Sequence, residues 1–325
     1  MLARHAESLF WMGRYMERAE DTARMLDVTY HGLLESPPEE ATRAWLDLLA
    51  VLSLDQAFAE RHDEVTAGLV SEFLVLDDKN PGAIVSAVGR ARENARSVRE
   101  LISTELWEAV NTFWLELLAR NLRADIEEQP YELYGLVKRR CQMVNGVTSE
   151  TMPRDDGWRF LMLGWMLERA EMTCRLLNVR YGELASATDL DGFHLLFGVL
   201  KSASASEAYR KTYGAAMNPA RVVEFLLLSR TFPRSVLFCL RQAERDLARL
   251  TPVETLTRPE RIVGRIRAEL EFGDVTELLA HGLHAHLDRV QEGVRAASEA
   301  LASQYFRNLH VDLHSIGSPE PFEGG

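Results

Sequence analysis

Two long stretches of the chain place apolar residues in steps of three and four, the spacing of an amphipathic helix. The first stretch runs from residue 3 to about residue 34, and the second from residue 158 to about residue 184. The apolar positions are Leu9, Met12, Met16, Ala19, Ala23, Leu26 and Tyr30 in the first stretch, and Phe160, Leu163, Leu167, Ala170, Cys174, Leu177 and Tyr181 in the second. The two sets share one offset of 151 residues, so the pattern predicts two equivalent long helices.

Shorter helical patterns fill the rest of the chain, and no stretch alternates with the period of a strand. Helix-start signals occur at Asn80-Pro81, at Thr257 with Glu260, and at Asp274 with Glu277. We predict an all-α protein, a multi-helix bundle made of two tandem, pseudo-symmetric helical repeats. Such copies are expected to pack about a twofold axis, by analogy with isologous dimers, which would bring the two long helices together.

The domain boundaries follow from the clearest interruption of the pattern, Thr148 to Gly157. We predict a first repeat over 1–147, a linker over 148–157 and a second repeat over 158–306, with the repeats packed as one domain. Residues 307–325 are a polar tail that we expect to be disordered.

A second set of repeated residues is polar and shares the long helices with the apolar positions. Because a helix turns about 100° per residue, these residues fall on one narrow stripe, about a quarter turn from the apolar face. The stripe holds Gly13, Glu17, Glu20 and Arg24 in the first copy, and Gly164, Glu168, Glu171 and Arg175 in the second. A glycine inside a helix costs about 1 kcal/mol against alanine, so its recurrence indicates close approach by another helix or a ligand.

Two arginines, Arg18 and Arg169, follow the first glutamate of each stripe but point further round the helix. Adjacent residues of a helix do not face one another, so each arginine should pair elsewhere. Arg18 could reach Asp21 or a carboxylate on another helix.

Three interpretations of the stripes stay open. Glutamates and arginines on facing helices can form an ion-pair network that fixes helix register without any activity. Alternatively, they line a polar cleft that binds a carboxylate, phosphate or amine, with the four glutamates Glu17, Glu20, Glu168 and Glu171 as candidate acid–base groups. The third interpretation, a di-iron site, needs Glu-x-x-His steps, whereas the steps here are Glu-x-x-Glu.

Other candidate residues lie outside the repeated stripes. Tyr209, Arg210 and Arg234 stand near expected helix ends, where anions can bind, although capping and packing are the favoured explanation for them. His281, His284 and His286 are clustered, but only two can share a helix face and no further ligand is evident, so we expect no metal site there. The sequence contains no P-loop, GxGxxG, HExxH or nucleophile elbow, and we expect no bound cofactor.

Composition and charge restrict the possible partners. The chain has 325 residues with a net charge of −12, which argues against non-specific binding to nucleic acid or anionic membrane. Its three cysteines are far apart, which suits free thiols in a reducing compartment. The first residues show no signal-peptide pattern, and no apolar run approaches the roughly 20 residues that span a bilayer. We therefore expect a cytoplasmic protein without membrane or nucleic-acid partners.

The segments Trp11–Glu20 and Leu163–Glu171 resemble the signature of the bacterial alpha-E family, named for an α-helical domain with an ER motif. Further segments resemble the family pattern: Ala91–Arg96, Arg154–Leu161, Glu207–Arg210 and Phe232–Ser235. The resemblance covers about residues 1 to 310. One departure is Trp165, where the first copy has Arg14. If Arg14 binds an anion, the second copy has lost that role.

The resemblance implies a functional setting but no defined reaction. Members resemble proteins encoded beside, or fused to, a circularly permuted ATP-grasp ligase, often with a transglutaminase-like protein and sometimes with a proteasome-like peptidase. We therefore expect a helical accessory protein of an amide-bond-forming or peptide-modifying system, which binds the ligase or its peptide-like substrate. The alternative is an enzyme in its own right, acting on an amide at a Glu/Arg cleft.

Overall fold

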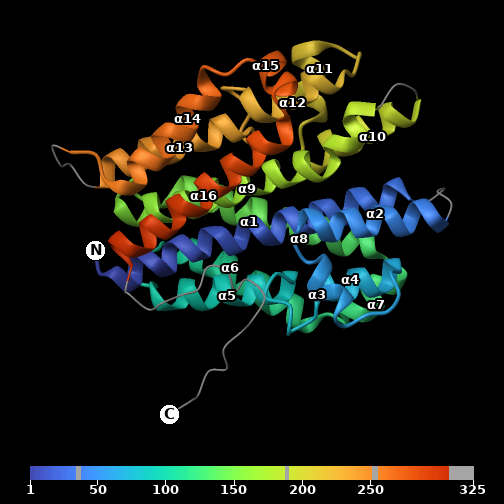
Figure 1. Ribbon diagram of the computed structural model, residues 1–325. Helices are drawn as coiled ribbons and strands as arrows, with labels where there is room; N and C mark the ends of the chain where they lie inside the picture. The colour runs from blue at the N-terminus through green and yellow to red at the C-terminus, as the bar shows by residue number, and fades with distance from the viewer. Residues whose placement is uncertain (34–37, 187–189, 251–254, 307–325) are drawn as a thin grey trace.

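The computed structural model describes residues 1–33, 38–186, 190–250 and 255–306. The described residues form sixteen helices and no strand, so the predicted all-α class is confirmed (Figure 1). The polar tail, for which we predicted disorder, lies outside the described residues. The helices are α1 (Ala3–Gly32), α2 (Pro38–Val51), α3 (Asp55–Ala59), α4 (Ala67–Val75), α5 (Ile84–Ser97), α6 (Thr104–Ala119), α7 (Leu122–Glu128), α8 (Pro130–Thr151), α9 (Asp156–Ser186), α10 (Leu190–Ser202), α11 (Ser206–Tyr213), α12 (Pro219–Leu228), α13 (Val236–Leu250), α14 (Arg258–Glu271), α15 (Val275–Ala280) and α16 (Leu283–Tyr305).

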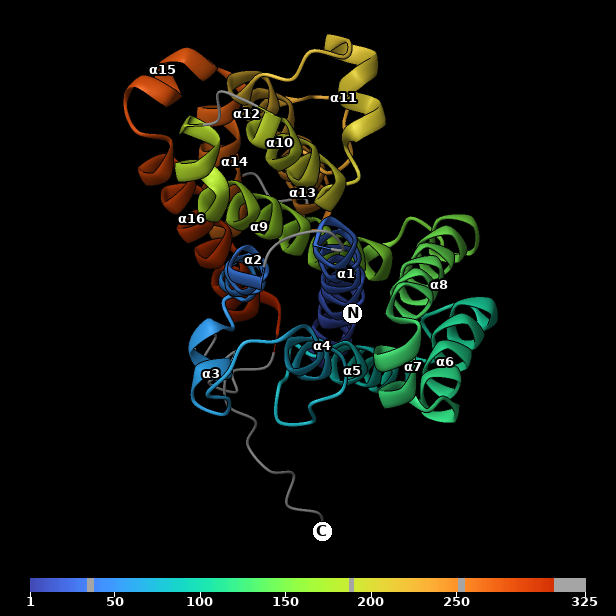
Figure 2. The same cartoon turned by 90° about the vertical axis from the view of Figure 1, so that its right-hand side faces the viewer.

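The two long helices, α1 and α9, pack directly against each other at the centre of the molecule. α5 and α8 cover α1 and have α6 behind them, whereas α13 and α16 cover α9 and have α14 behind them (Figures 1 and 2). α2 and α10 each contact both long helices. The predicted adjacency of the long helices is confirmed, and the apolar core is continuous across both halves.

Both central helices are buried on nearly every face along much of their length. The predicted apolar positions from Leu9 to Leu26 and from Phe160 to Leu177 are buried, as expected. The polar stripes are buried as well, apart from the partly exposed Arg175, and the exposed residues of α1 are confined to its ends. A helix surrounded in this way needs internal partners for its charged side chains.

Gly13 and Gly164 allow α1 and α9 to cross at backbone contact distance. A Cβ atom on Gly13 would lie 2.2 Å from the carbonyl oxygen of Leu161, and one on Gly164 would lie 1.9 Å from that of Phe10. The two contacts are equivalent, because Gly164 is the repeat counterpart of Gly13 and Phe10 is that of Leu161, each at the offset of 151. The predicted close approach by another helix is therefore correct at both glycines.

The connection between the two halves is shorter than the predicted linker over 148–157. α8 continues to Thr151 and α9 begins at Asp156. The hydroxyl of Thr148 donates to the Val144 carbonyl at 2.7 Å, and that of Thr151 to the Val147 carbonyl at 2.8 Å. These hydrogen bonds satisfy the two hydroxyl groups inside α8. The polar residues from Thr148 to Thr151 therefore continue the helix and do not end it.

Capping explains which predicted helix starts are correct. Thr257 and Glu260 form a reciprocal capping box on α14, and Asp274 caps α15. The start predicted at Asn80-Pro81 is too early, because α5 begins at Ile84. The Asn80 side chain instead holds a turn, accepting from the Gly82 amide and donating to the Phe73 carbonyl, both at 2.9 Å.

Two serines with positive φ end the equivalent helices α2 and α10. Ser53 has φ 57° and Ser204 has φ 50°, a backbone conformation that favours glycine. Each follows a Schellman pattern, in which the next amide bonds five residues back: Leu54 to Leu49 at 2.9 Å, and Ala205 to Leu200 at 2.7 Å. Only Ser204 also uses its hydroxyl, which accepts from Arg24.

These serines make a matched pair for mutation. Ser53→Gly is expected to raise the free energy of unfolding by about 1 kcal/mol, because it relieves the left-handed conformation. Ser204→Gly relieves the same strain but leaves the Nη1 group of the buried Arg24 without its acceptor, which costs about 1–3 kcal/mol. Urea denaturation of both variants tests this, and an equal gain at both sites would contradict the role of Ser204.

Candidate functional site

The glutamates and arginines of the stripes form two buried clusters at the crossing of α1 and α9. The Glu17 cluster consists of Glu17, Glu20, Asp21, Arg24, Arg169 and Arg234. The Glu168 cluster consists of Glu168, Glu171, Arg14, Arg18 and Arg175.

Glu17 is the centre of its cluster and is fully inaccessible to solvent. Arg169 binds it in a bidentate manner, with Nε–Oε1 at 2.6 Å and Nη2–Oε2 at 2.7 Å. Arg234, just before α13, reaches Glu17 at 2.8 Å, Asp21 at 2.7 Å and Glu20 at 3.1 Å. Three carboxylates therefore share the guanidinium of Arg234.

Glu168 has the corresponding position in the second cluster. Arg18 binds it through Nε at 2.7 Å and Nη2 at 3.2 Å, and Arg14 Nε binds it at 2.5 Å. Arg14 also reaches Glu171 at 2.6 Å and donates to the Ser298 hydroxyl of α16 at 3.1 Å. Arg175 completes the cluster by pairing with Glu171.

The pairing between the two long helices is reciprocal. Glu17 of α1 binds Arg169 of α9, and Glu168 of α9 binds Arg18 of α1. An offset of 151 converts one pair into the other. Each arginine thus pairs with a carboxylate on the other long helix. For Arg18, this is the second of the two predicted partners, a carboxylate on another helix and not Asp21.

The third guanidinium of each cluster comes from a different place in the chain. Arg14 supplies it to the Glu168 cluster, and its counterpart Trp165 is buried. Arg234 supplies it to the Glu17 cluster. The anions that Arg14 binds are the carboxylates of Glu168 and Glu171 in the protein itself. Trp165 cannot supply a guanidinium to the Glu17 cluster, and Arg234 supplies it instead.

Burial and pairing act in opposite directions on the acidic groups. Burial alone would raise the pKa of Glu17, but Arg169 and Arg234 outweigh it and lower that pKa to about 2. The pKa of Glu168 is also about 2, because Arg14 and Arg18 outweigh burial. For Asp21, burial dominates over Arg234 and raises the pKa to about 7. Its second oxygen, Oδ2, is buried without a hydrogen-bond partner.

These shifts predict opposite pH effects on stability. Glu17 and Glu168 have folded pKa values below their ordinary value of 4.5, so their contribution is present above pH 4.5 and is lost toward pH 2. Asp21 has a folded pKa above its ordinary value of 3.8, so only the folded state stays protonated between about pH 4 and 7. Stability should therefore fall as the pH rises through that window.

Asp21→Asn is expected to remove this fall in the free energy of unfolding between about pH 4 and 7. Urea denaturation at several pH values across this range measures the free energy of unfolding of the variant and of the wild type. The difference between the two proteins removes the contribution of other titrating groups, such as His286, whose pKa is lowered mainly by burial. An unchanged pH dependence in the variant would refute the assignment to Asp21.

The structure brings ten of the twelve predicted site residues together. Tyr209 and Arg210 lie instead on α11. Tyr209 is buried against Tyr213 and Phe225, and its hydroxyl donates to the Ala216 carbonyl at 3.4 Å, so packing explains it. Arg210 is exposed.

Repeat comparison missed several residues that complete the clusters. Asp21 has Met172 at the equivalent position, so it lacked the signal that marked its neighbours. Ser204 and Ser298 contact the clusters through tertiary structure alone. The spacing of Glu17 and Asp21, four residues apart on one helix, was the available clue for Asp21.

The histidine cluster is split by the structure. His284 is exposed and contacts Asn178 and Asp288, whereas His286 is buried. Within residues 1–33, 38–186, 190–250 and 255–306, no group of three or more His, Cys, Asp or Glu side chains is placed to hold a metal ion.

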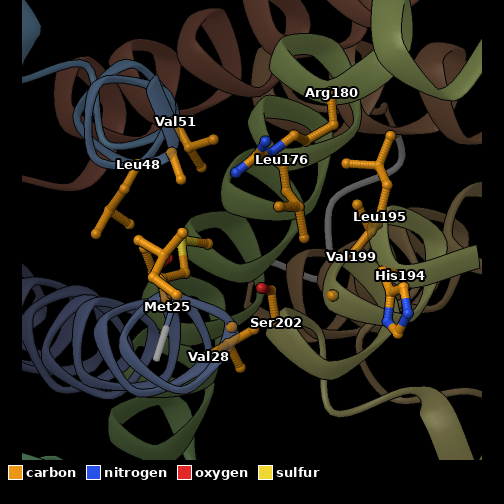
Figure 3. Close-up of a pocket in the computed structure, with 15 residues that line it drawn as sticks. Met25, Val28, Leu48, Val51, Leu176, Arg180, His194, Leu195, Val199 and Ser202 are labelled. Atoms are coloured by element: carbon orange, nitrogen blue, oxygen red, sulfur yellow. The ribbon is translucent and has the colours of Figure 1, made fainter. Parts of the chain in front are cut away.

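A pocket lies where the C-terminal halves of α1 and α9 meet α2 and α10 (Figure 3). It has a volume of about 150 Å³. Its described lining residues are Met25, Val28, Thr29, Gly32, Leu33, Ala44, Leu48, Val51, Leu176, Arg180, His194, Leu195, Gly198, Val199 and Ser202. The four candidate glutamates do not line it.

The model of one protein family, described as an α-helical domain with a conserved ER motif, matches residues 1–306. The chain belongs to the alpha-E family. In this alpha-E chain the ER pairs are Glu17-Arg18 and Glu168-Arg169, and each glutamate binds the arginine of the other pair.

This alpha-E chain is similar to uncharacterized proteins of Mycobacterium bovis and of two Mycobacterium tuberculosis strains. Each is 26% identical over 328 residues, covering 90% of the chain and 35% of the relative. The alpha-E chain thus spans about a third of the length of these relatives. No solved structure matches it. No described helix has both the length and the apolar character needed to cross a membrane.

Proposed function

We propose that this chain is a helical partner protein of a circularly permuted ATP-grasp amidoligase in a peptide- or amide-modifying system. It binds the ligase or the peptide-like substrate of that ligase in the cytoplasm. A transglutaminase-like protein and a proteasome-like peptidase are further candidate partners. The family setting motivates this proposal. About two thirds of the length of the relatives lies outside the matched region, which is room for a fused partner domain.

The observation that carries the proposal is the sealing of the Glu/Arg stripes. Glu17 and Glu168 are 0% and 3% exposed, and arginines occupy both carboxylates. With pKa values of about 2, neither is a proton donor near neutral pH. Catalysis at an open Glu/Arg cleft is therefore disfavoured, and a binding role is the better proposal.

Asp21 is the acidic group of the clusters whose pKa suits proton transfer near neutral pH. It is only 2% exposed, however, and does not line the pocket. A substrate would have to open the α1–α9 crossing to reach it. This geometry favours a structural role for Asp21 over an enzymatic one.

Co-purification with the neighbouring ATP-grasp ligase tests the proposal, followed by measurement of ATP turnover with and without this chain. We expect co-elution and a change in turnover. Absence of both would defeat the partner role. Turnover of an amide substrate by this chain alone would favour the enzyme instead.

A further inference from the structure

The pocket between α1, α2, α9 and α10 has the size of one large hydrophobic side chain. A cavity of about 150 Å³ lined by aliphatic residues can hold a benzene ring, and this pocket has the same volume. Met25 and Leu176, at equivalent positions of α1 and α9, both line it (Figure 3). Both halves of the chain therefore contribute to one concave apolar site.

The walls of the pocket combine aliphatic groups with a few hydrogen-bond donors. Polar side chains come from Thr29, Arg180, His194 and Ser202, and none of the described lining residues is acidic. Asp47 pairs with Arg180 at 2.8 Å, which fixes the guanidinium at the wall. A positioned guanidinium beside an apolar cavity is suited to the carbonyl or carboxylate oxygens that accompany a hydrophobic side chain in a peptide.

An aromatic strip on α10 extends the apolar surface beyond the pocket. Phe193 is 42% exposed and stacks with Phe197 at 6.2 Å. The ammonium group of Lys201 lies 4.8 Å from the centre of the Phe197 ring. These three residues precede the lining residues His194, Gly198 and Ser202 by one position each, so the strip runs beside the pocket.

We propose that the pocket and the α10 strip bind a polypeptide segment of the partner, which inserts one aromatic or large aliphatic side chain and carries a carboxylate next to it. The strip favours a polypeptide over a small molecule, because apolar contact area continues outside the cavity. Lys201 favours an acidic neighbour, since a chain of net charge −12 attracts a carboxylate only where its surface is locally cationic. This inference rests on the partner function proposed above.

Replacing a glycine with leucine on α10 and on α8 distinguishes filling of the pocket from a change in helix propensity. Gly198 lines the pocket, and a Cβ atom there would meet nothing within 4 Å. Gly146, exposed on α8, has the same open surroundings and lies outside the pocket. Both substitutions to leucine add helix propensity, but only Gly198→Leu fills the cavity.

The first experiment measures binding of N-acetyl-phenylalanine and of N-acetyl-phenylalaninamide to the full chain by ligand-observed NMR. We expect both probes to bind the wild type and Gly146→Leu, and Gly198→Leu to weaken them at least about tenfold because the cavity is filled. Lys201→Glu should weaken the acid by about threefold and spare the amide. Absence of binding, or undiminished binding to Gly198→Leu, would overturn the pocket. If Lys201→Glu changes the binding of the acid and of the amide equally, the proposed carboxylate next to the inserted side chain is wrong.

The second experiment repeats ligase co-purification with the same variants. Co-elution of the wild type and Gly146→Leu but not of Gly198→Leu supports the inference. Co-elution of all three overturns the inference and leaves the partner function standing. If the wild type neither co-elutes nor changes ATP turnover, the partner function fails, and the inference that rests on it fails too.

Discussion

Replacing Gly13 or Gly164 with alanine is expected to destabilise the fold by about 3 kcal/mol or more, at the upper end for overpacking. The new Cβ atoms would stand 2.2 Å and 1.9 Å from carbonyl oxygens of the opposing helix. Backbone atoms cannot rotate away as a side chain can, so α1 and α9 would have to separate. That separation would also pull apart the reciprocal ion pairs.

Chemical denaturation of Gly13→Ala and Gly164→Ala measures this effect, with Gly146→Ala as the matched control. Gly146 has open space, so its replacement should stabilise the chain by about 0.5–1 kcal/mol through helix propensity. A stabilisation of similar size at Gly13 or Gly164 would show that the helices do not cross at these glycines.

The second large effect is expected for Arg169→Ala, which should lower the free energy of unfolding by about 3–5 kcal/mol. The variant removes both bidentate bonds from a carboxylate that is 0% exposed. Arg234 would remain, but it already serves Glu20 and Asp21. Glu17 would therefore lack a guanidinium of its own to compensate its buried charge.

Two further variants test whether the lower free energy of unfolding of Arg169→Ala comes from the buried charge of Glu17. Arg96→Ala removes an exposed ion pair with Glu93, which should cost at most about 1 kcal/mol. Adding Glu17→Gln to Arg169→Ala should recover part of the stability, because it removes the unpaired charge. A melting temperature of Arg169→Ala equal to that of the wild type would favour an exposed, functional arginine instead.

The sequence allowed prediction of the helical class, the two central helices and eight of the cluster residues, because each depends on local periodicity or on the repeat itself. Arg14 was a candidate from the first copy of the motif alone, and Arg234 from its place near an expected helix end. The 151-residue offset marked Gly13 and Gly164 before any contact was known. Asp21 could not be found in this way, since its counterpart is Met172. The shared use of Arg234 by three carboxylates depends on how α13 is placed, which no local pattern encodes.

The structure distinguishes the open interpretations of the stripes for a physical reason. Alternation of apolar and polar residues indicates one buried face and one solvated face. α1 and α9 are enclosed on nearly all sides, so their polar stripe is interior. Enclosure is a property of the packed assembly of helices, and only the structure distinguishes a sealed network from an open cleft.

The exchange of partners between the two ER pairs has a consequence for how the chain unfolds. Each half supplies a glutamate whose arginine belongs to the other half, so neither half can bury its own central helix with balanced charge. A state with only one half folded would expose the long apolar side of its central helix and leave Glu17 or Glu168 without its partner. We therefore expect loss of either half to destabilise the other, so that the described helices of both halves unfold together.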